Sequence, residues 1–125
     1  WLCHDGSGPI TSQAIPEGFS MFTARDMNSP QSPRVETHLP RFEAAAIPDP
    51  EAEDWQAWGK LLASQEFSEN CTQHEGAMCV TTDFGFGTVN ASLLALPAPS
   101  DPVRRPIWRF AAGAPDKNFF VDIST

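Results

Sequence analysis

The stretch from Met78 to Leu96 constrains the fold most, because two strand-like runs face each other across a turn. Between the runs lies Phe84-Gly85-Phe86-Gly87, whose glycines can take the positive φ angles of a tight reversal. The second run has apolar residues at both odd and even positions, which is typical of a strand covered on both faces. We therefore predict a hairpin of Met78–Phe84 and Thr88–Leu96 at the centre of a layered domain.

The length and the net charge of the chain limit the number of domains and the kinds of partner that we expect. The chain has 125 residues, 41% of them hydrophobic, which suits either one domain over residues 1–125 or the C-terminal part of a larger domain. Eight basic and sixteen acidic residues give a net charge of -8, which repels phosphate backbones and anionic lipids. We expect no nucleic-acid partner and, since no apolar run approaches about 20 residues, no membrane span.

Three cysteines, Cys3, Cys71 and Cys79, cannot all pair within the chain. An odd number favours free thiols in a reducing compartment, so we expect a soluble, cytoplasmic protein. A Cys71–Cys79 bridge remains the alternative.

Further strands are predicted on both sides of the hairpin. Residues 1–15 form a weaker hairpin around a glycine-rich turn, and Phe19–Ala24 is a short strand candidate. Near the end of the chain, Ile107–Ala111 alternates as a strand does, and Phe119–Ile123 can pair back on it.

Two helices are predicted to cover the sheet. Val35, Leu39 and Phe42 have helical spacing, and Pro40 either starts or kinks that helix. A second helix begins near Pro50, after the capping residue Asp49. The fold class is therefore α+β, a mainly antiparallel sheet with one or two helices packed on it.

The residues with catalytic potential form no recognisable constellation. Cys3-His4-Asp5 is consecutive, but neighbours in a strand point to opposite faces, so these side chains do not form a triad. Gly85-Phe86-Gly87 lacks the Lys-Ser/Thr of a phosphate loop, so a hairpin turn is the better interpretation. The three histidines lie outside metal-binding spacings, so we expect no metal site.

Two other groups of residues have both a structural and a binding interpretation. Trp55 and Trp58 share one helical face, where they either form core or stack on a flat ligand. The polar loop containing Asp26, Asn28 and Arg34 either orients a substrate or only forms turns.

Two motifs resemble a known family. Ser29-Pro30-Gln31-Ser32-Pro33-Arg34-Val35 and Phe86-Gly87-Thr88-Val89-Asn90-Ala91-Ser92 are similar to two motifs in the second half of NRDE-family proteins, the relatives of transport and Golgi organisation protein 2. The family's tryptophan in the first motif is Ser32 here, and its arginine in the second is Val89. The resemblance implies the C-terminal half of an αββα sandwich, similar to N-terminal nucleophile hydrolases. Together with the polar loop it gives one candidate set of substrate-binding residues: Asp26, Asn28, Arg34, Thr88 and Asn90.

The resemblance implies two activities. The chain would belong either to a thiol-dependent amidohydrolase whose nucleophile lies upstream, with no catalytic residue here, or to a haem-trafficking carrier, with haem as its cofactor. Its partner would be an N-terminal half or a second copy of the chain. Two alternatives do not use the resemblance: a self-contained, non-enzymatic binding or structural module, and a stand-alone hydrolase that uses Cys3 or Asp26 with a histidine.

Overall fold

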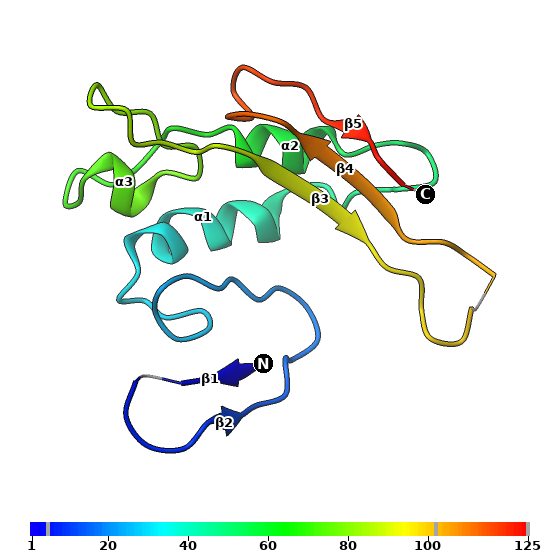
Figure 1. Ribbon diagram of the computed structural model, residues 1–125, viewed down its shortest axis with the longest axis horizontal. Coiled ribbons are helices and arrows are strands. Elements are labelled where there is room, and N and C mark those ends of the chain that lie inside the picture. Colours follow the sequence, from blue (N-terminus) through cyan, green and yellow to red (C-terminus); the bar gives the residue numbers. More distant parts are fainter. Residues whose placement is uncertain (5, 102, 125) are drawn as a thin grey trace.

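The computed structural model describes residues 1–4, 6–101 and 103–124 (Figure 1). Helices and strands share the chain, and all strand pairs are antiparallel, which confirms the predicted α+β class. The elements in chain order are β1 (Leu2–Cys3), β2 (Thr11–Ser12), α1 (Pro33–Ala44), α2 (Gln56–Leu62), α3 (Gln73–Gly76), β3 (Ala91–Ala95), β4 (Ile107–Ala111) and β5 (Val121–Asp122). The αββα sandwich remains a prediction.

The larger sheet has the order β3-β4-β5. β4 coincides with the predicted strand Ile107–Ala111, and β5 pairs back on it as expected. Leu93 lies opposite Arg109, and Leu94 lies opposite Trp108. Because alternate residues point to opposite faces, Leu93 and Ala111 belong to the buried face and Leu94 to the outer face.

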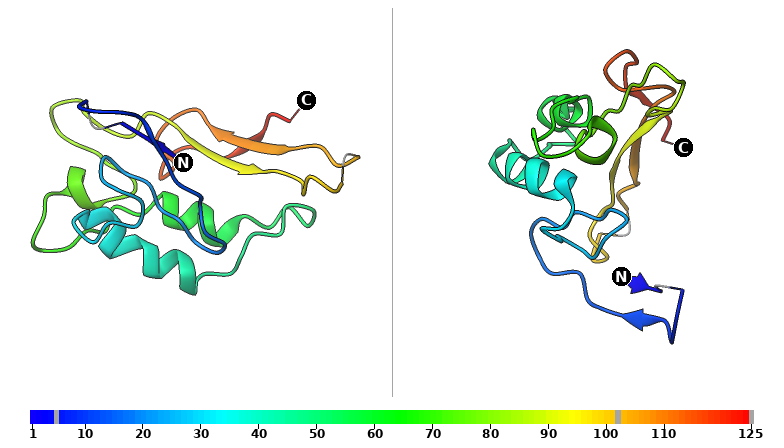
Figure 2. Two further views of the ribbon diagram at one scale, coloured as in Figure 1. Left: turned by 90° about the horizontal axis from the view of Figure 1, so that it is seen from below. Right: turned by 90° about the vertical axis from the view of Figure 1, so that its left-hand side faces the viewer.

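The helices lie on one side of this sheet (Figure 2). α1 begins at Pro33, after Ser32, whose hydroxyl accepts a hydrogen bond from the N–H of Val35. Pro40 lies inside the helix, so the alternative of a helix start at Pro40 is wrong. The covered face of the sheet and the inner sides of the helices form the core.

The predicted central hairpin forms only around its turn, where Gly85 has a φ of 84°. An antiparallel bridge joins Thr81 to Gly87, and the N–H of Thr88 donates to the carbonyl oxygen of Val80 at 2.9 Å. The long pairing of Met78–Phe84 with Thr88–Leu96 is wrong, because Met78–Phe84 contains no strand. The N–H of Cys79 donates to the carbonyl oxygen of Ser64 at 2.9 Å, so the chain before Val80 is bonded to the segment after α2. β3 pairs with β4 instead and lies at the edge of the sheet.

The second helix begins later than predicted, at Gln56 and not near Pro50. Asp49 and Asp54 exchange two backbone hydrogen bonds of 2.9 Å, which closes a turn before the helix. Glu53 has a φ of 55°, outside the right-handed helical region. The turn therefore does not run on into the helix as its first turn. Trp55 follows this turn and is buried.

The N-terminal part partly agrees with the prediction. β1 and β2 pair as the expected weak hairpin within residues 1–15. The predicted strand at Phe19–Ala24 is wrong, because the side chain of Asn28 takes up its backbone groups. The N–H of Met21 donates to Oδ1 of Asn28 at 2.6 Å, and Nδ2 of Asn28 donates to the carbonyl oxygen of Phe19 at 3.2 Å. The segment therefore curls around one amide instead of extending along a sheet.

Candidate functional site

An open, mostly apolar hollow of about 590 Å³ lies between the N-terminal segment, the helices and β3, and we call it the aromatic groove. The N-terminal segment contributes Ile15, Gly18, Phe19, Ser20, Met21 and Phe22. The helices and the residue before α2 contribute Leu39, Phe42, Trp55, Trp58 and Leu62. The remaining wall consists of Met78 and, from β3, Ser92, Leu93 and Leu94. Its volume is in the range of small-molecule and cofactor sites.

Trp58 is held in the groove by two other aromatic rings. Its ring lies 5.3 Å from that of Phe42 at an interplanar angle of 82°, an edge-to-face arrangement. The ring of Phe19 lies 6.2 Å away on another side. Trp55 is buried, whereas Trp58 is half-buried and lines the groove. The structural and the binding interpretations of this pair therefore both apply to Trp58.

Three polar atoms of the groove residues are buried without a hydrogen-bond partner among the described residues: Nε1 of Trp55, Nε1 of Trp58 and Oγ of Ser20. Leaving a buried donor or acceptor unsatisfied costs about 1–3 kcal/mol. Buried polar groups without partners are rare in folded proteins. Their gathering around one hollow distinguishes the aromatic groove from ordinary core.

The five candidate substrate-binding residues lie outside the aromatic groove. Asn28 organises the curled N-terminal segment, and the hydroxyl of Thr88 accepts a hydrogen bond from the N–H of Val80 at 2.9 Å. Asp26 is exposed beside a smaller hollow near Trp1, and Asn90 is exposed before β3. Their role as substrate contacts remains a prediction.

Arg34, the fifth candidate, has its guanidinium engaged by backbone oxygens. Its Nε donates to the carbonyl oxygen of Ala77 at 2.7 Å, and Nη2 donates to that of His74 at 2.6 Å. These bonds join the first turn of α1 to α3 and the residue after it. Such contacts give Arg34 a structural role.

The cysteines are free, as expected, and the alternative Cys71–Cys79 bridge is absent. Cys79 is buried, and its Sγ lies 3.3 Å from Oδ1 of Asp116. Burial first, and then the neighbouring Asp116, raise the pKa of the Cys79 thiol. The thiolate that a nucleophile needs is therefore disfavoured at Cys79.

His38 lies in α1 and is fully buried. Both of its ring nitrogens have polar neighbours. Its Nε2 lies 3.1 Å from the carbonyl oxygen of Glu66, and its Nδ1 lies 3.3 Å from Nη1 of Arg41. Arg41 forms an ion pair with Glu66 at 2.7 Å, which closes the cluster. Burial lowers the pKa of His38, so the neutral imidazole acts here as a link between α1 and the segment after α2.

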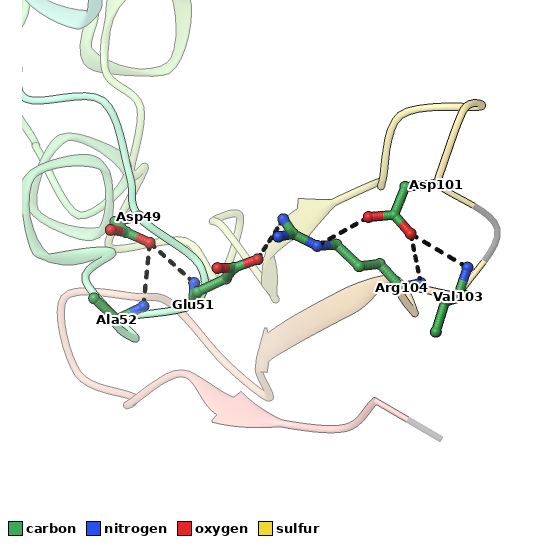
Figure 3. A network of polar contacts seen from close by, with 6 residues as sticks. All are labelled: Asp49, Glu51, Ala52, Asp101, Val103 and Arg104. Atoms are coloured by element: carbon green, nitrogen blue, oxygen red, sulfur yellow. Dashed lines mark hydrogen bonds and ion pairs between the residues drawn. The ribbon is translucent and has the colours of Figure 1, made fainter.

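An exposed polar network joins the long connection between β3 and β4 to the turn before α2 (Figure 3). Arg104 forms ion pairs with Glu51 and with Asp101. Asp49 and Asp101 each accept two backbone N–H groups of their own loops through Oδ1. Exposed ion pairs contribute about 0–1 kcal/mol each, and turn formation accounts for both carboxylates.

Within the described residues, no group of three or more His, Cys, Asp or Glu side chains is placed to hold a metal ion. In the same part of the chain, no helix has the length and apolar character that crossing a bilayer requires. Comparison with protein families, with curated proteins and with solved structures finds no match for this chain. The NRDE resemblance and the activities that it implies stay predictions.

Sequence reasoning missed the groove as a whole. The sequence pattern predicts the tryptophan pair as core or ligand stack, but it places Phe19, Met21 and Phe22 in a strand. The available signal is the density of large apolar residues in Phe19–Phe22, which contains neither glycine nor proline. Only the three-dimensional fold brings that run beside α1, α2 and β3.

Proposed function

We propose that this chain is a non-enzymatic binding module whose aromatic groove receives an apolar group of a binding partner. The observation that carries the proposal is the convergence of an open apolar hollow and three buried, unpartnered polar atoms on the same residues. Binding sites combine an apolar lining with a few polar groups that orient the ligand.

The side chains with catalytic potential support a binding role over a hydrolytic one. Burial keeps the Cys79 thiol protonated, and both ring nitrogens of His38 have neighbours that fix the ring. Nucleophilic catalysis requires a reactive nucleophile within reach of a base, and both groups serve the packing of the core. These observations argue against a hydrolase that uses Cys79 or His38, whereas the hydrolase that uses Cys3 or Asp26 stays a prediction.

A second candidate is the half of an αββα sandwich, as in the NRDE resemblance. The specific observation that favours it is the outer face of the larger sheet, where Leu94, Trp108 and Val121 are exposed. Leu94 and Trp108 are directly opposite each other, and the helices cover the other face. A second sheet from an NRDE-like N-terminal half would cover these side chains. In that arrangement the upstream segment would supply the nucleophile or the haem ligands.

A neutral fluorescent probe, N-phenyl-1-naphthylamine, tests the binding proposal. We expect saturable, one-to-one binding that changes the emission of the groove tryptophans. Phe22 lines the groove, so Phe22→Glu should weaken probe affinity by at least about tenfold, or about 1.4 kcal/mol. Phe84 is 81% exposed and lies outside the groove, so Phe84→Glu is the matched control and should bind as the original chain does. Equal affinity of the two folded variants would contradict the proposal.

A further inference from the structure

We infer that the partner is an extended segment of another polypeptide, which pairs as an added strand with the free edge of β3 beside the aromatic groove. This inference rests on the proposed function and names its occupant. It follows from the direction of the backbone groups along β3 and from the position of the groove.

The hydrogen bonds of β4 show which way the backbone of β3 faces. The carbonyl oxygen of Trp108 accepts a hydrogen bond from the N–H of Ile123 at 2.9 Å, and the N–H of Trp108 donates to Oγ of Ser124 at 2.9 Å. Both backbone groups of Trp108 therefore face the β5 side. Backbone groups alternate along a strand, so those of Arg109 face β3, where Arg109 lies opposite Leu93.

The same alternation continues in β3. Because the N–H and C=O groups of Leu93 face β4, those of Ser92 and Leu94 point away from β4. Among the described residues no strand pairs with this second edge of β3. Two N–H groups and two C=O groups are thus presented in the spacing that an added strand needs, and such an edge is a template for pairing.

The free edge of β3 lies on the side of the sheet toward α1, whereas β5 lies on the other side (Figure 1). Ser92, Leu93 and Leu94 are also the β3 residues that line the aromatic groove. The same stretch of strand therefore offers main-chain hydrogen bonds and borders an apolar hollow. Strand addition uses this combination, in which the main chain gives affinity and the hollow selects alternate side chains.

The chemistry of the occupant follows from the surroundings. Its residues should alternate, with large apolar side chains at the positions that enter the groove and polar ones between them. The net charge of -8 favours basic residues at its ends and disfavours acidic ones. A compact small molecule would use the apolar hollow but not the backbone groups of Ser92 and Leu94.

The test compares two substitutions at Ser92. Its N–H points to the free edge, so Ser92→Pro removes the donor that the added strand needs without removing a bond to β4. Ser92→Ala is the matched control, because it removes the same hydroxyl and keeps the N–H. The hydroxyl of Ser92 accepts a hydrogen bond from Nε1 of Trp108, which both variants lose.

The probe is a fluorescein-labelled peptide of about nine residues in which phenylalanine and threonine alternate between terminal lysines. Fluorescence polarisation should show that Ser92→Pro weakens peptide binding by at least about tenfold relative to Ser92→Ala. Because both variants lose the same hydroxyl from the groove lining, any change in their affinity for N-phenyl-1-naphthylamine should be the same in both. Equal peptide affinity of two folded variants, or an original chain that binds the neutral probe but not the peptide, would overturn strand addition and leave the proposed function standing. If the original chain bound neither the peptide nor the neutral probe, both proposals would be overturned.

Amide hydrogen exchange in the original chain provides a second test that needs no substitution. Addition of the peptide should slow exchange at Ser92 and Leu94, whose N–H groups point to the free edge. The amide of Leu93 already faces β4 and should change much less. Unchanged exchange at Ser92 and Leu94 with saturating peptide would overturn the inference even if Ser92→Pro failed to fold.

Discussion

Nε of Arg34 donates a hydrogen bond of 2.7 Å to the carbonyl oxygen of Ala77, which joins the first turn of α1 to the residue that follows α3. A second bond from the same guanidinium reaches the carbonyl oxygen of His74. The side chain therefore holds one wall of the fold in place, close to Met78 of the aromatic groove.

Replacement of Arg34 should lower stability. Hydrogen bonds to charged groups contribute about 1.5–3 kcal/mol, and we expect Arg34→Met to lower the free energy of unfolding by an amount in that range. Arg25 is exposed and its described hydrogen bond uses the backbone N–H, so Arg25→Met is the matched control, with a change below about 0.5 kcal/mol. Urea denaturation followed by tryptophan emission gives both values, and equal values would contradict this role of Arg34.

Cys79 should react slowly with thiol reagents in the folded protein. Its side chain is buried, and burial raises its pKa. We expect alkylation by iodoacetamide at about pH 8 to modify Cys79 more slowly than the half-buried Cys3, and to accelerate at Cys79 when the chain is unfolded in urea. Peptide mass mapping measures the two rates. Faster labelling of Cys79 than of Cys3 in the folded chain would contradict the effect of burial on the Cys79 thiol.

His38 should make stability depend on pH. Burial lowers its pKa below the ordinary value of 6.5, so the unfolded chain binds a proton at a higher pH than the folded chain does. The stabilisation is complete above pH 6.5 and is lost as the pH falls through that value toward the lower pKa of the folded state.

Urea titrations between about pH 7.5 and about pH 5.5 measure this effect. The free energy of unfolding should fall with pH in the original chain, and this part of the slope should vanish in His38→Gln. The exposed His4 is the control, since His4→Gln should keep the slope. An unchanged slope in a folded His38→Gln chain would assign the pH dependence to other groups.

The exposed outer face of the sheet gives a prediction for the second candidate function. Without its partner, the chain should associate through Leu94, Trp108 and Val121 at high micromolar concentration, because a stable interface buries at least about 1,000 Å² in total. Trp108→Glu should restore a monomer in sedimentation equilibrium, whereas Val103→Glu, on the exposed connection, should not. A monomeric original chain would contradict the sandwich half.

Local sequence patterns predicted the strands that depend on alternation and local pairing. Ile107–Ala111 is a strand with the predicted bounds, since its alternating side chains leave one face for burial. The N-terminal hairpin also follows from its glycine-rich turn. In both cases the residues whose pattern determines the element lie close together in the sequence.

The central hairpin and the groove could not be predicted, because distant contacts decide both. In the apolar run at Met78–Val80, Cys79 and Val80 are buried, and Cys79 bonds to Ser64 while only Val80 bonds to Thr88 after the turn. Leu93 is 4% exposed and Leu94 is 55% exposed, so the apolar pattern on both faces of this run marks a one-sided sheet with an open face. The aromatic groove combines residues from three parts of the chain, which no local pattern relates.

Chemical-shift mapping tests the central claim, the binding role of the aromatic groove, most directly. Amide spectra of the original chain would be recorded during addition of N-phenyl-1-naphthylamine and, separately, of the alternating peptide. We predict that both ligands shift Phe19, Trp58 and Leu93, and that only the peptide also protects Ser92 and Leu94 from exchange. Shifts confined to the exposed turn at Phe84 and Phe86, or no saturable shifts with either ligand, would contradict the account.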